Sequence, residues 1–418
     1  MSSTTCHPTS VLCVENLQKL LREELGNDLE VKHFTTEALT QSGENYGSTI
    51  LAVEVSCSEN SSESLQNLSL VAKLMPPSQF LCDAFDINIT FSNEVRTYVL
   101  IKPEHQKLQE EKQIPPEKRL DIFPRFYGAR TNFHENLFEE ADECAILLME
   151  NLKTSGFHVP DRKKGLNLKH MEFGVTCLAR FHALTIALKL NKPQVFKETV
   201  LKACCKFQLG RKFDTEKLIS KTVSCVESIP ECLPYIKQIE DKLRRTDEFL
   251  TFEPKEPFAT LLHNDLWVNN MLFKYSSQDD VNCENPNAMK FVDFQIIVYD
   301  SPIRDLLFFL FTSSEDGLLD KHLDFFLSLY HKELLGYLTL LECDTKDFNH
   351  DKFQEELVCF ATKEFTHILY LLKIVSAENT GGQTLEESEM KMYDTNVGEI
   401  YKRRVKTLVR TFVERGWL

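Results

Sequence analysis

The chain of 418 residues lacks the features of several large protein classes. It carries 48 Lys and Arg against 63 Asp and Glu, a formal net charge of −15, and no basic run. This balance argues against a nucleic-acid partner. No stretch approaches the ~20 apolar residues that a membrane helix needs. The first residues, MSSTTCHPTSVLC, have neither the basic start nor the apolar core of a signal peptide. We therefore expect neither a membrane protein nor a nucleic-acid-binding protein.

The 13 cysteines also lack a regular pattern. Their number is odd, and neither Cys204-Cys205 nor the pair Cys225 and Cys232 has the spacing of zinc ligands. Reduced thiols in the cytoplasm are therefore the expectation. Hydrophobic residues make up 42% and aromatic residues 10% of the chain, which describes a globular protein. Its length is sufficient for two lobes or domains.

The most informative pattern is a predicted hairpin late in the chain. Two short apolar runs, Asn269–Tyr275 and Met289–Phe294, flank a polar segment rich in Ser, Asp and Asn. This pattern predicts two strands joined by a long loop. Asp265 lies in the turn before the first strand, Asn270 at its start, and Asp293 at the end of the second. A hairpin can therefore bring these three side chains to the same rim.

Phosphoryl transfer needs this set of groups. One carboxylate (Asp265) orients the attacking hydroxyl, while an amide oxygen (Asn270) and a second carboxylate (Asp293) hold Mg²⁺ against the phosphates of ATP. The order His-x-Asp from His263, an Asn five residues after the Asp, and then Asp-Phe matches the kinase motifs. His-x-Asp alone is weak evidence, because it also occurs in metal hydrolases and ordinary turns. The combination predicts a phosphotransferase. A polar hairpin without function and a metallohydrolase are the alternatives, although no further ligands stand at metal spacing.

The N-terminal part predicts a β-rich region that covers the nucleotide. A strand at Leu29–Phe34 is followed by a small-residue turn that contains Gly43, Gly47 and Ser48, and then by a strand at Thr49–Cys57. In kinases such a turn covers the ATP phosphates with backbone N–H groups. By themselves, the two glycines also fit an ordinary hairpin turn.

Lys73 is the one charged residue in a β-rich run, Asn67–Met75. Such a lysine lies either at a solvated edge or turned inward towards an anion. The next segment, Phe85–Ile101, is predicted to be a helix that carries Glu94. In a kinase the strand lysine meets the α- and β-phosphates, and a helix glutamate braces it. Glu104 is a more distant candidate for the glutamate.

The segment Lys102–Leu120 is charged and contains Pro115-Pro116, so we predict a loop or a poorly ordered connection. Strands at Phe123–Ala129 and Ala145–Met149 follow. Residues 150–153 are then predicted to be a hinge between an N-terminal nucleotide lobe (1–149) and a helical lobe (154–418) with the catalytic loop and acceptor pocket. The backbone of Glu150 and Leu152 would bond the adenine edge, and a plain strand end is the alternative.

The C-terminal part is predicted to be helical. Leu166–Leu190 has the clearest helical spacing, and His182 on its apolar face is interpreted as a core histidine. Further helices are predicted at His322–Leu340, Phe353–Ser376 and Met390–Arg415. Most of the Phe rings of this region should be core, and a minority could line an apolar acceptor pocket; they are Phe309, Phe311, Phe325, Phe326 and Phe365.

The segment after Asp293 is too short for the activation segment of a protein kinase, because Asp305 already begins the apolar run DLLFFLFTS. A small-molecule acceptor is therefore expected, and a protein substrate is not. A charge at the head of an apolar helix needs partners. Asp305 could cap its own helix and also bond the backbone of the turn around His263; a simple N-cap explains its position equally well.

Together these motifs resemble the ecdysteroid kinase-like family, a branch of the choline kinase and aminoglycoside phosphotransferase group. The family usually has Gly where this chain has Asn264, and Gln295 replaces the familiar glycine after Asp-Phe. The matching pieces are the turn from Gly43 to Ser48, Val71-Ala72-Lys73, Glu150-Asn151-Leu152, Leu178-Ala179-Arg180-Phe181-His182-Ala183, His263 to Asn270 with Trp267, and Val292-Asp293-Phe294-Gln295.

The resemblance implies an α+β, bilobal protein-kinase-like fold with an antiparallel β-rich N-lobe and a largely helical C-lobe. It implies ATP with Mg²⁺ and an acceptor such as an ecdysteroid or other steroid, or a phenolic or alcoholic xenobiotic. A cationic acceptor of the choline or aminoglycoside type and a nucleotide-binding pseudokinase are the rival hypotheses. By residue, Lys73 and Glu94 would hold phosphates, Asp265 the acceptor hydroxyl, Asn270 and Asp293 the metal, and His263 would brace the loop. The oligomeric state stays open.

Overall fold

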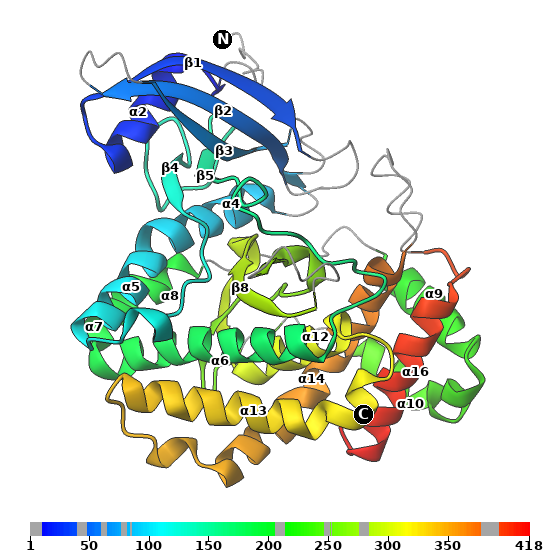
Figure 1. The fold of residues 1–418 in the computed structure, drawn as a ribbon. Helices are drawn as coiled ribbons and strands as arrows, with labels where there is room; N and C mark the ends of the chain where they lie inside the picture. The colour runs from blue at the N-terminus through cyan, green and yellow to red at the C-terminus, as the bar shows by residue number, and fades with distance from the viewer. Residues whose placement is uncertain are drawn as a thin grey trace.

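The computed structural model describes residues 11–39, 48–59, 65–76, 82–83, 86–204, 214–245, 251, 253–275, 284–377 and 393–418. An antiparallel five-stranded sheet near the N-terminus stands above a largely helical region (Figure 1). Its strands lie in the order β1-β2-β3-β5-β4. They are β1 (Leu29–Ala38), β2 (Thr49–Glu59), β3 (Gln66–Leu74), β4 (Phe126–Arg130) and β5 (Ile146–Glu150).

One face of this sheet forms a core of its own with helix α2 (Val14–Leu25). Along β2 the buried positions Val53, Val55 and Cys57 alternate with more exposed ones, as the two-residue period of a strand requires. The leucines of α2 pack against them, and each fully buried leucine contributes roughly 1.5–3 kcal/mol relative to an exposed one. The predicted strands are confirmed, with ends shifted by a few residues.

The other face of the sheet is covered by α4 (Ile87–Arg96), which continues through one π-helical turn (Thr97–Ile101) into α5 (Lys102–Glu111). The prediction of a loop from Lys102 onward is therefore wrong for its first half. Pro103 comes directly after the π turn, and prolines and π turns are common causes of irregularity inside a continuous helix. Leu108 is fully buried, and His105 bonds Thr185 of a later helix. The exposed charges of α5, such as Lys107 and Glu110, lie on its outer face.

The C-terminal region is built on α6 (Leu168–Asn191), with α13 (Leu318–Leu340) lying along it (Figure 1). Of the described helices, only α6 is long and apolar enough, by length and composition, to cross a membrane. We had expected no such segment. Most of α6 is buried in the core. Every residue of α12 (Pro302–Ser313) is buried. The remaining helices are α7 (Pro193–Glu198), α8 (Val200–Ala203), α9 (Thr215–Glu227), α10 (Ile236–Arg244), α12 (Pro302–Ser313), α14 (His350–Ser376) and α16 (Glu399–Glu414).

Two small antiparallel pairs lie between the sheet and these helices. The predicted hairpin is confirmed as β7 (Met271–Tyr275) and β8 (Pro286–Phe291), with Met271 opposite Phe291. The second pair joins β6 (Thr260–Leu262) to β9 (Val298–Asp300). Its strands bring the segment before Asp265 and the segment after Asp293 side by side.

A buried ion triad ties β9 to α12 and α14. The Arg304 side chain, 1% exposed, lies 2.7 Å from Asp300 and 3.0 Å from Glu364, which are equally buried. We expect Arg304→Met to destabilise the protein by about 3–5 kcal/mol, because it leaves two buried carboxylates without their cation. Chemical denaturation measures this loss. The matched control is Arg410→Met, which removes an exposed pair with Asp320 and should cost at most about 1 kcal/mol. Equal effects of the two changes would contradict the account.

Candidate active site

Lys73 lies inside the protein and joins the sheet to the hairpin. On the central strand β3 its neighbours Ala72 and Leu74 face the core shared with α2, so Lys73 points to the opposite face. Its ammonium nitrogen lies 2.5 Å from Glu94 Oε2 on α4 and 2.7 Å from Asp293 Oδ1. The inward orientation of Lys73 is therefore the observed one, and Glu94 is its helix partner.

The electrostatics of this contact keep Lys73 charged. Burial by itself would lower the pKa of the ammonium group, but the negative charges of Asp293 and Glu94 outweigh it and raise the pKa above its usual range. Only 4% of the Lys73 residue is exposed. A cation held this way is suited to an anion such as a phosphate.

Asp265 and Asn270 are joined directly at the start of the hairpin. The amide nitrogen of Asn270 donates to the Asp265 backbone oxygen (2.8 Å) and to its carboxylate Oδ2 (2.9 Å). The backbone of Asn270 also accepts from the N–H of Val292 (3.1 Å), the residue before Asp293. The hairpin thus brings Asp265, Asn270 and Asp293 together, as the sequence predicted.

The donor set at this rim fits Mg²⁺. Both hydrogen bonds from the Asn270 side chain use its nitrogen, so its amide oxygen is available as a ligand. The Asp293 side chain is 21% exposed, and its Oδ1 is the oxygen bonded to Lys73. Carboxylate and amide oxygens are the ligands that Mg²⁺ prefers. The described residues contain no group of three or more His, Cys, Asp or Glu side chains that could hold a metal.

The pKa of Asp265 is raised well above its ordinary range. Burial is the main cause and the charge of Asp293 adds to it, while hydrogen bonds from the Asn270 and Trp267 side chains oppose the shift. The folded state therefore binds a proton more tightly than the unfolded state. This contribution to stability is fully present below the unfolded pKa and is lost as the pH rises through the folded pKa.

We therefore expect Asp265→Asn to stabilise the protein at about pH 7, because asparagine keeps an acceptor for Asn270 and removes a half-buried charge. The gain should shrink as the pH approaches about 4, where wild-type Asp265 is largely protonated. Urea denaturation at both values measures the difference. A variant less stable than wild type at neutral pH would contradict this expectation.

The turn before Asp265 is held by Asp305. Its Oδ2 accepts the N–H of His263 (2.7 Å) and its Oδ1 the N–H of Asn264 (2.8 Å). The suggestion that Asp305 caps its own helix is wrong, because Ser301 is the N-cap of α12 and Asp305 lies within the first turn. Two hydrogen bonds to the neighbouring turn satisfy the carboxylate better than an N-cap position would.

His263 braces the same turn from the other side. Its Nε2 lies 3.0 Å from the carbonyl oxygen of Val292, and its ring centroid lies 4.8 Å from that of Phe294. Phe294 also packs against Phe123 and Tyr98, at ring-centroid distances of 4.9 and 6.0 Å. This aromatic cluster joins the segment before β4, the π turn and the 3-10 turn after the hairpin, and sequence reasoning missed it because its members are far apart in the chain.

Asn264 adopts a left-handed backbone conformation, with φ of +63°. Glycine adopts this conformation freely and asparagine tolerates it. Asn264 can therefore take the place of the family's glycine with little backbone strain. We expect Asn264→Gly to change stability by less than about 0.5 kcal/mol, and Asn264→Val to lose roughly 1–2 kcal/mol. Thermal denaturation of the two variants measures this. A valine variant as stable as the glycine variant would show that the backbone is not constrained here.

The predicted hinge lies at the end of β5. The N–H of Glu150 donates to the Arg125 carbonyl (2.9 Å), and the carbonyl of Leu152 accepts from Phe157 (2.9 Å). An adenine at this position would therefore use the Glu150 carbonyl and the Leu152 N–H. Ser48 is buried at the start of β2, whereas Gly43 and Gly47 lie outside the described residues.

His182 is a buried core histidine, as predicted, and its ring also contacts polar side chains on two other helices, which the sequence did not indicate. Its ring lies 2.7 Å from the Tyr330 hydroxyl and 3.2 Å from Asp305 Oδ2. A contact between three helices leaves no local pattern in a sequence. The hydrogen bond from the Trp267 side chain to Asp265, two residues earlier, is a local contact that the sequence analysis also missed.

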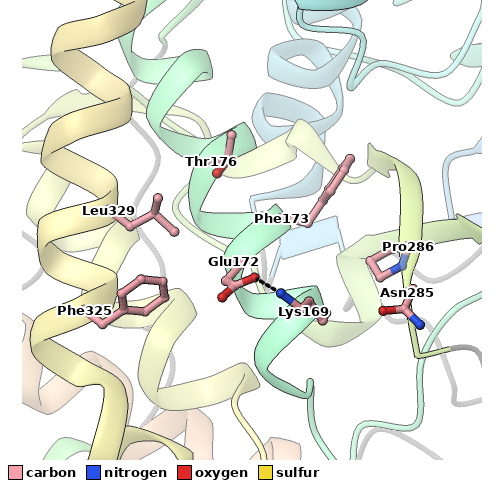
Figure 2. Close-up of a pocket in the computed structure, with 8 residues that line it drawn as sticks. All are labelled: Lys169, Glu172, Phe173, Thr176, Asn285, Pro286, Phe325 and Leu329. Atoms are coloured by element: carbon pink, nitrogen blue, oxygen red, sulfur yellow. Dashed lines mark hydrogen bonds and ion pairs between the residues drawn. The ribbon is translucent and has the colours of Figure 1, made fainter.

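A cavity of about 350 Å³ lies between α6, α13 and the start of β8 (Figure 2). It is lined by Phe173, Phe325 and Leu329 together with the ion pair Lys169–Glu172. Phe325 is thus the one of the five predicted rings that lines this cavity; Phe309, Phe311, Phe326 and Phe365 are core. None of the candidate site residues lines it, so it is distinct from the site described above.

Three features define the protein-kinase-like fold. They are a β-sheet lysine paired to a helix glutamate, a helical C-terminal region, and a hairpin that carries Asp265, Asn270 and Asp293. The predicted α+β fold class is therefore confirmed. Within that class, a profile of the ecdysteroid kinase-like family matches residues 42–343. The chain belongs to the ecdysteroid kinase-like family, a family of kinase-like small-molecule phosphotransferases.

Solved structures of similar proteins are distant in sequence. An ethanolamine kinase from Plasmodium vivax is 11% identical, with a TM-score of 0.39, over 96% of this chain and 90% of its own. A GDP complex of an aminoglycoside 2'-phosphotransferase-IIIa mutant is 11% identical, with a TM-score of 0.37, over 97% and 99%. A choline/ethanolamine kinase family protein from Mesorhizobium loti is 9% identical, with a TM-score of 0.35, over 95% and 99%. None of the curated proteins compared with this chain matches it.

Proposed function

We propose that this protein is an ATP- and Mg²⁺-dependent kinase that transfers the γ-phosphoryl group to a hydroxyl of a small, largely apolar molecule. An ecdysteroid or other steroid, or a phenolic or alcoholic xenobiotic, is the proposed acceptor class. The observation that carries the proposal is the contact of Lys73 with both Glu94 and Asp293, at 2.5 and 2.7 Å. This contact supports a phosphate-binding role for Lys73, because the lysine lies beside the hairpin that carries the proposed base and metal ligands.

In the proposed mechanism each side chain has one task. Lys73, held by Glu94, binds the nucleotide phosphates, and its raised pKa keeps it charged. Asp265 orients the acceptor hydroxyl and takes its proton as the phosphoryl group moves. The amide nitrogen of Asn270 holds the Asp265 carboxylate in place, while its oxygen and Asp293 would hold Mg²⁺. A bound Mg²⁺ neutralises charge on the transferring phosphoryl group.

We further propose that residues 1–149 and 154–418 act as two lobes, with residues 150–153 as the hinge. The separate hydrophobic core of the sheet and α2 supports this division. Although α5 belongs to the first segment in sequence, it packs on the second: Gln109 and Tyr337 are joined by a 2.6 Å hydrogen bond.

The short connection after Asp293 supports a small acceptor. A 3-10 turn (Phe294–Ile296) and β9 lead directly to α12 at Pro302, which leaves no platform for a peptide. The free thiols of the described cysteines fit the proposed cytoplasmic location. A cationic acceptor, such as the ethanolamine or choline in the names of the similar structures, is the second candidate, and a nucleotide-binding pseudokinase is the third.

The test is incubation of the purified protein with γ-labelled ATP, Mg²⁺ and a panel of steroids, phenols, alcohols, choline, ethanolamine and aminoglycosides. Mass spectrometry should detect a phosphate monoester of an apolar hydroxyl compound. Transfer to the cationic compounds alone would replace the proposed acceptor class. Nucleotide binding without transfer or ATP hydrolysis would favour a pseudokinase.

A further inference from the structure

Three buried side chains from three helices form a chain that ends at the turn before Asp265. The Tyr330 hydroxyl on α13 lies 2.7 Å from His182 Nδ1 on α6, and His182 Nε2 lies 3.2 Å from Asp305 Oδ2 on α12. No side chain in this series is more than 1% exposed. Asp305 in turn accepts the N–H groups of His263 and Asn264. Water is thus excluded from the whole path.

The hydrogen positions follow from what each group can donate and accept. Burial alone would raise the pKa of Asp305, but hydrogen bonds from His182 and from the N–H of His263 lower it, so the carboxylate is ionised. An ionised carboxylate only accepts, and therefore His182 Nε2 carries a proton. If Nδ1 were also protonated, the Tyr330 hydroxyl hydrogen would have no acceptor among the described residues. Nδ1 is therefore the acceptor, and Tyr330 donates to it.

We infer that Tyr330 and His182 are positioning residues for the proposed catalytic Asp265. The ionised Asp305 fixes the tautomer of His182 with hydrogen on Nε2, Tyr330 holds the ring in position by donating to Nδ1, and the Nε2–H in turn fixes the rotation of the Asp305 carboxylate. The two oxygens of Asp305 then hold the backbone of the turn one and two residues before Asp265. The catalytic part of this inference rests on the proposed function, whereas its structural part does not.

The expected size of the effect follows from geometry. Without the His182 donor, Asp305 is held only by the two N–H groups that it is meant to position, so the turn and the carboxylate can shift together. Misplacement of a reacting group by about 1 Å can cost roughly 10²-fold in rate. We therefore expect Tyr330→Phe to lower kcat about tenfold and His182→Leu up to about 10²-fold, with the KM for ATP changed less than about twofold.

Matched variants separate positioning from a loss of stability. Tyr337 is a second buried tyrosine of α13, and its hydroxyl bonds Gln109 and the N–H of Leu120, away from Asp305. Tyr337→Phe should therefore destabilise the protein to a similar extent and leave kcat unchanged. His182→Gln places an amide N–H near the Nε2 position and should restore most of the rate that His182→Leu loses.

The deciding measurements do not require activity. In the ¹⁵N spectrum of histidine-labelled protein, His182 should carry hydrogen on Nε2 and none on Nδ1 in the wild type. Hydrogen exchange of the peptide that contains His263 and Asn264 should be faster in Tyr330→Phe than in Tyr337→Phe. Hydrogen on Nδ1 in the wild type, or equal exchange in the two variants, would overturn the inference. Loss of the proposed function would show instead as absence of transfer by the wild type, with these two results unchanged.

Discussion

Asp293→Ala is expected to abolish Mg²⁺-dependent phosphoryl transfer. The substitution removes a proposed metal ligand and one of the two anions that hold Lys73, whose ammonium lies 2.7 Å from Asp293. Metal stabilisation of transition-state charge is worth several kcal/mol, and each 1.36 kcal/mol is a factor of ten. The rate of transfer should therefore fall about 10³-fold or more in single-turnover measurements with Mg²⁺ and ATP.

The control for this variant is another carboxylate, Asp121, which lies before β4 and pairs with a lysine of the same hairpin. Asp121 forms an ion pair of 2.7 Å with the buried Lys290 of β8, but it belongs to none of the proposed roles. Asp121→Ala should leave the rate within about twofold of wild type. Raising the Mg²⁺ concentration should restore little activity to Asp293→Ala, because Asn270, an uncharged side chain, would be the only proposed metal ligand left. A wild-type rate in Asp293→Ala would remove Asp293 from the mechanism.

Asp265→Asn is expected to lower kcat by about 10²–10⁴-fold, the usual contribution of a general base. Asparagine still accepts the hydrogen bond from Asn270, which is 2.9 Å long in the wild type, so the turn should keep its shape. Because the change removes only the proton acceptor, the KM for ATP should stay within about twofold. The loss therefore belongs to the chemical step and not to nucleotide binding.

Single-turnover kinetics with any accepted substrate measure this effect. Asp214→Asn is a suitable control, because Asp214 caps α9 and its carboxylate accepts a backbone N–H, which asparagine also does. Its rate should equal that of the wild type. If Asp265→Asn retains the wild-type rate, or loses only nucleotide affinity, Asp265 does not act on the acceptor hydroxyl.

Local sequence patterns were sufficient for the hairpin and for Lys73. The two apolar runs around a polar loop predicted β7 and β8, and their register places Asn270 and Asp293 at one end. The single charge in a β-rich run singled out Lys73 but left a solvated edge and an inward orientation open; the structure shows the inward one, with Glu94 at 2.5 Å. Both are features of short segments, where spacing decides which side chains meet.

Long-range packing could not be read from local patterns. The charge of Lys102–Glu111 concealed a helix, because α5 is stabilised by the face that it buries against α6 and α13 and not by its own propensity. The role of Asp305 was left between two alternatives, and the observed hydrogen bonds to His263 and Asn264 decided it. The contact of His182 with Tyr330 joins residues 148 positions apart, for which a single sequence contains no signal.

A crystal structure with Mg²⁺ and a non-hydrolysable ATP analogue tests the central claim most directly. The account predicts that Lys73 leaves Asp293, keeps Glu94 and contacts the α- and β-phosphates, while the metal lies between the Asn270 oxygen and Asp293. The adenine should contact the backbone of Glu150 and Leu152. A nucleotide bound elsewhere, or a Lys73–Asp293 ion pair that persists beside bound phosphates, would contradict the account.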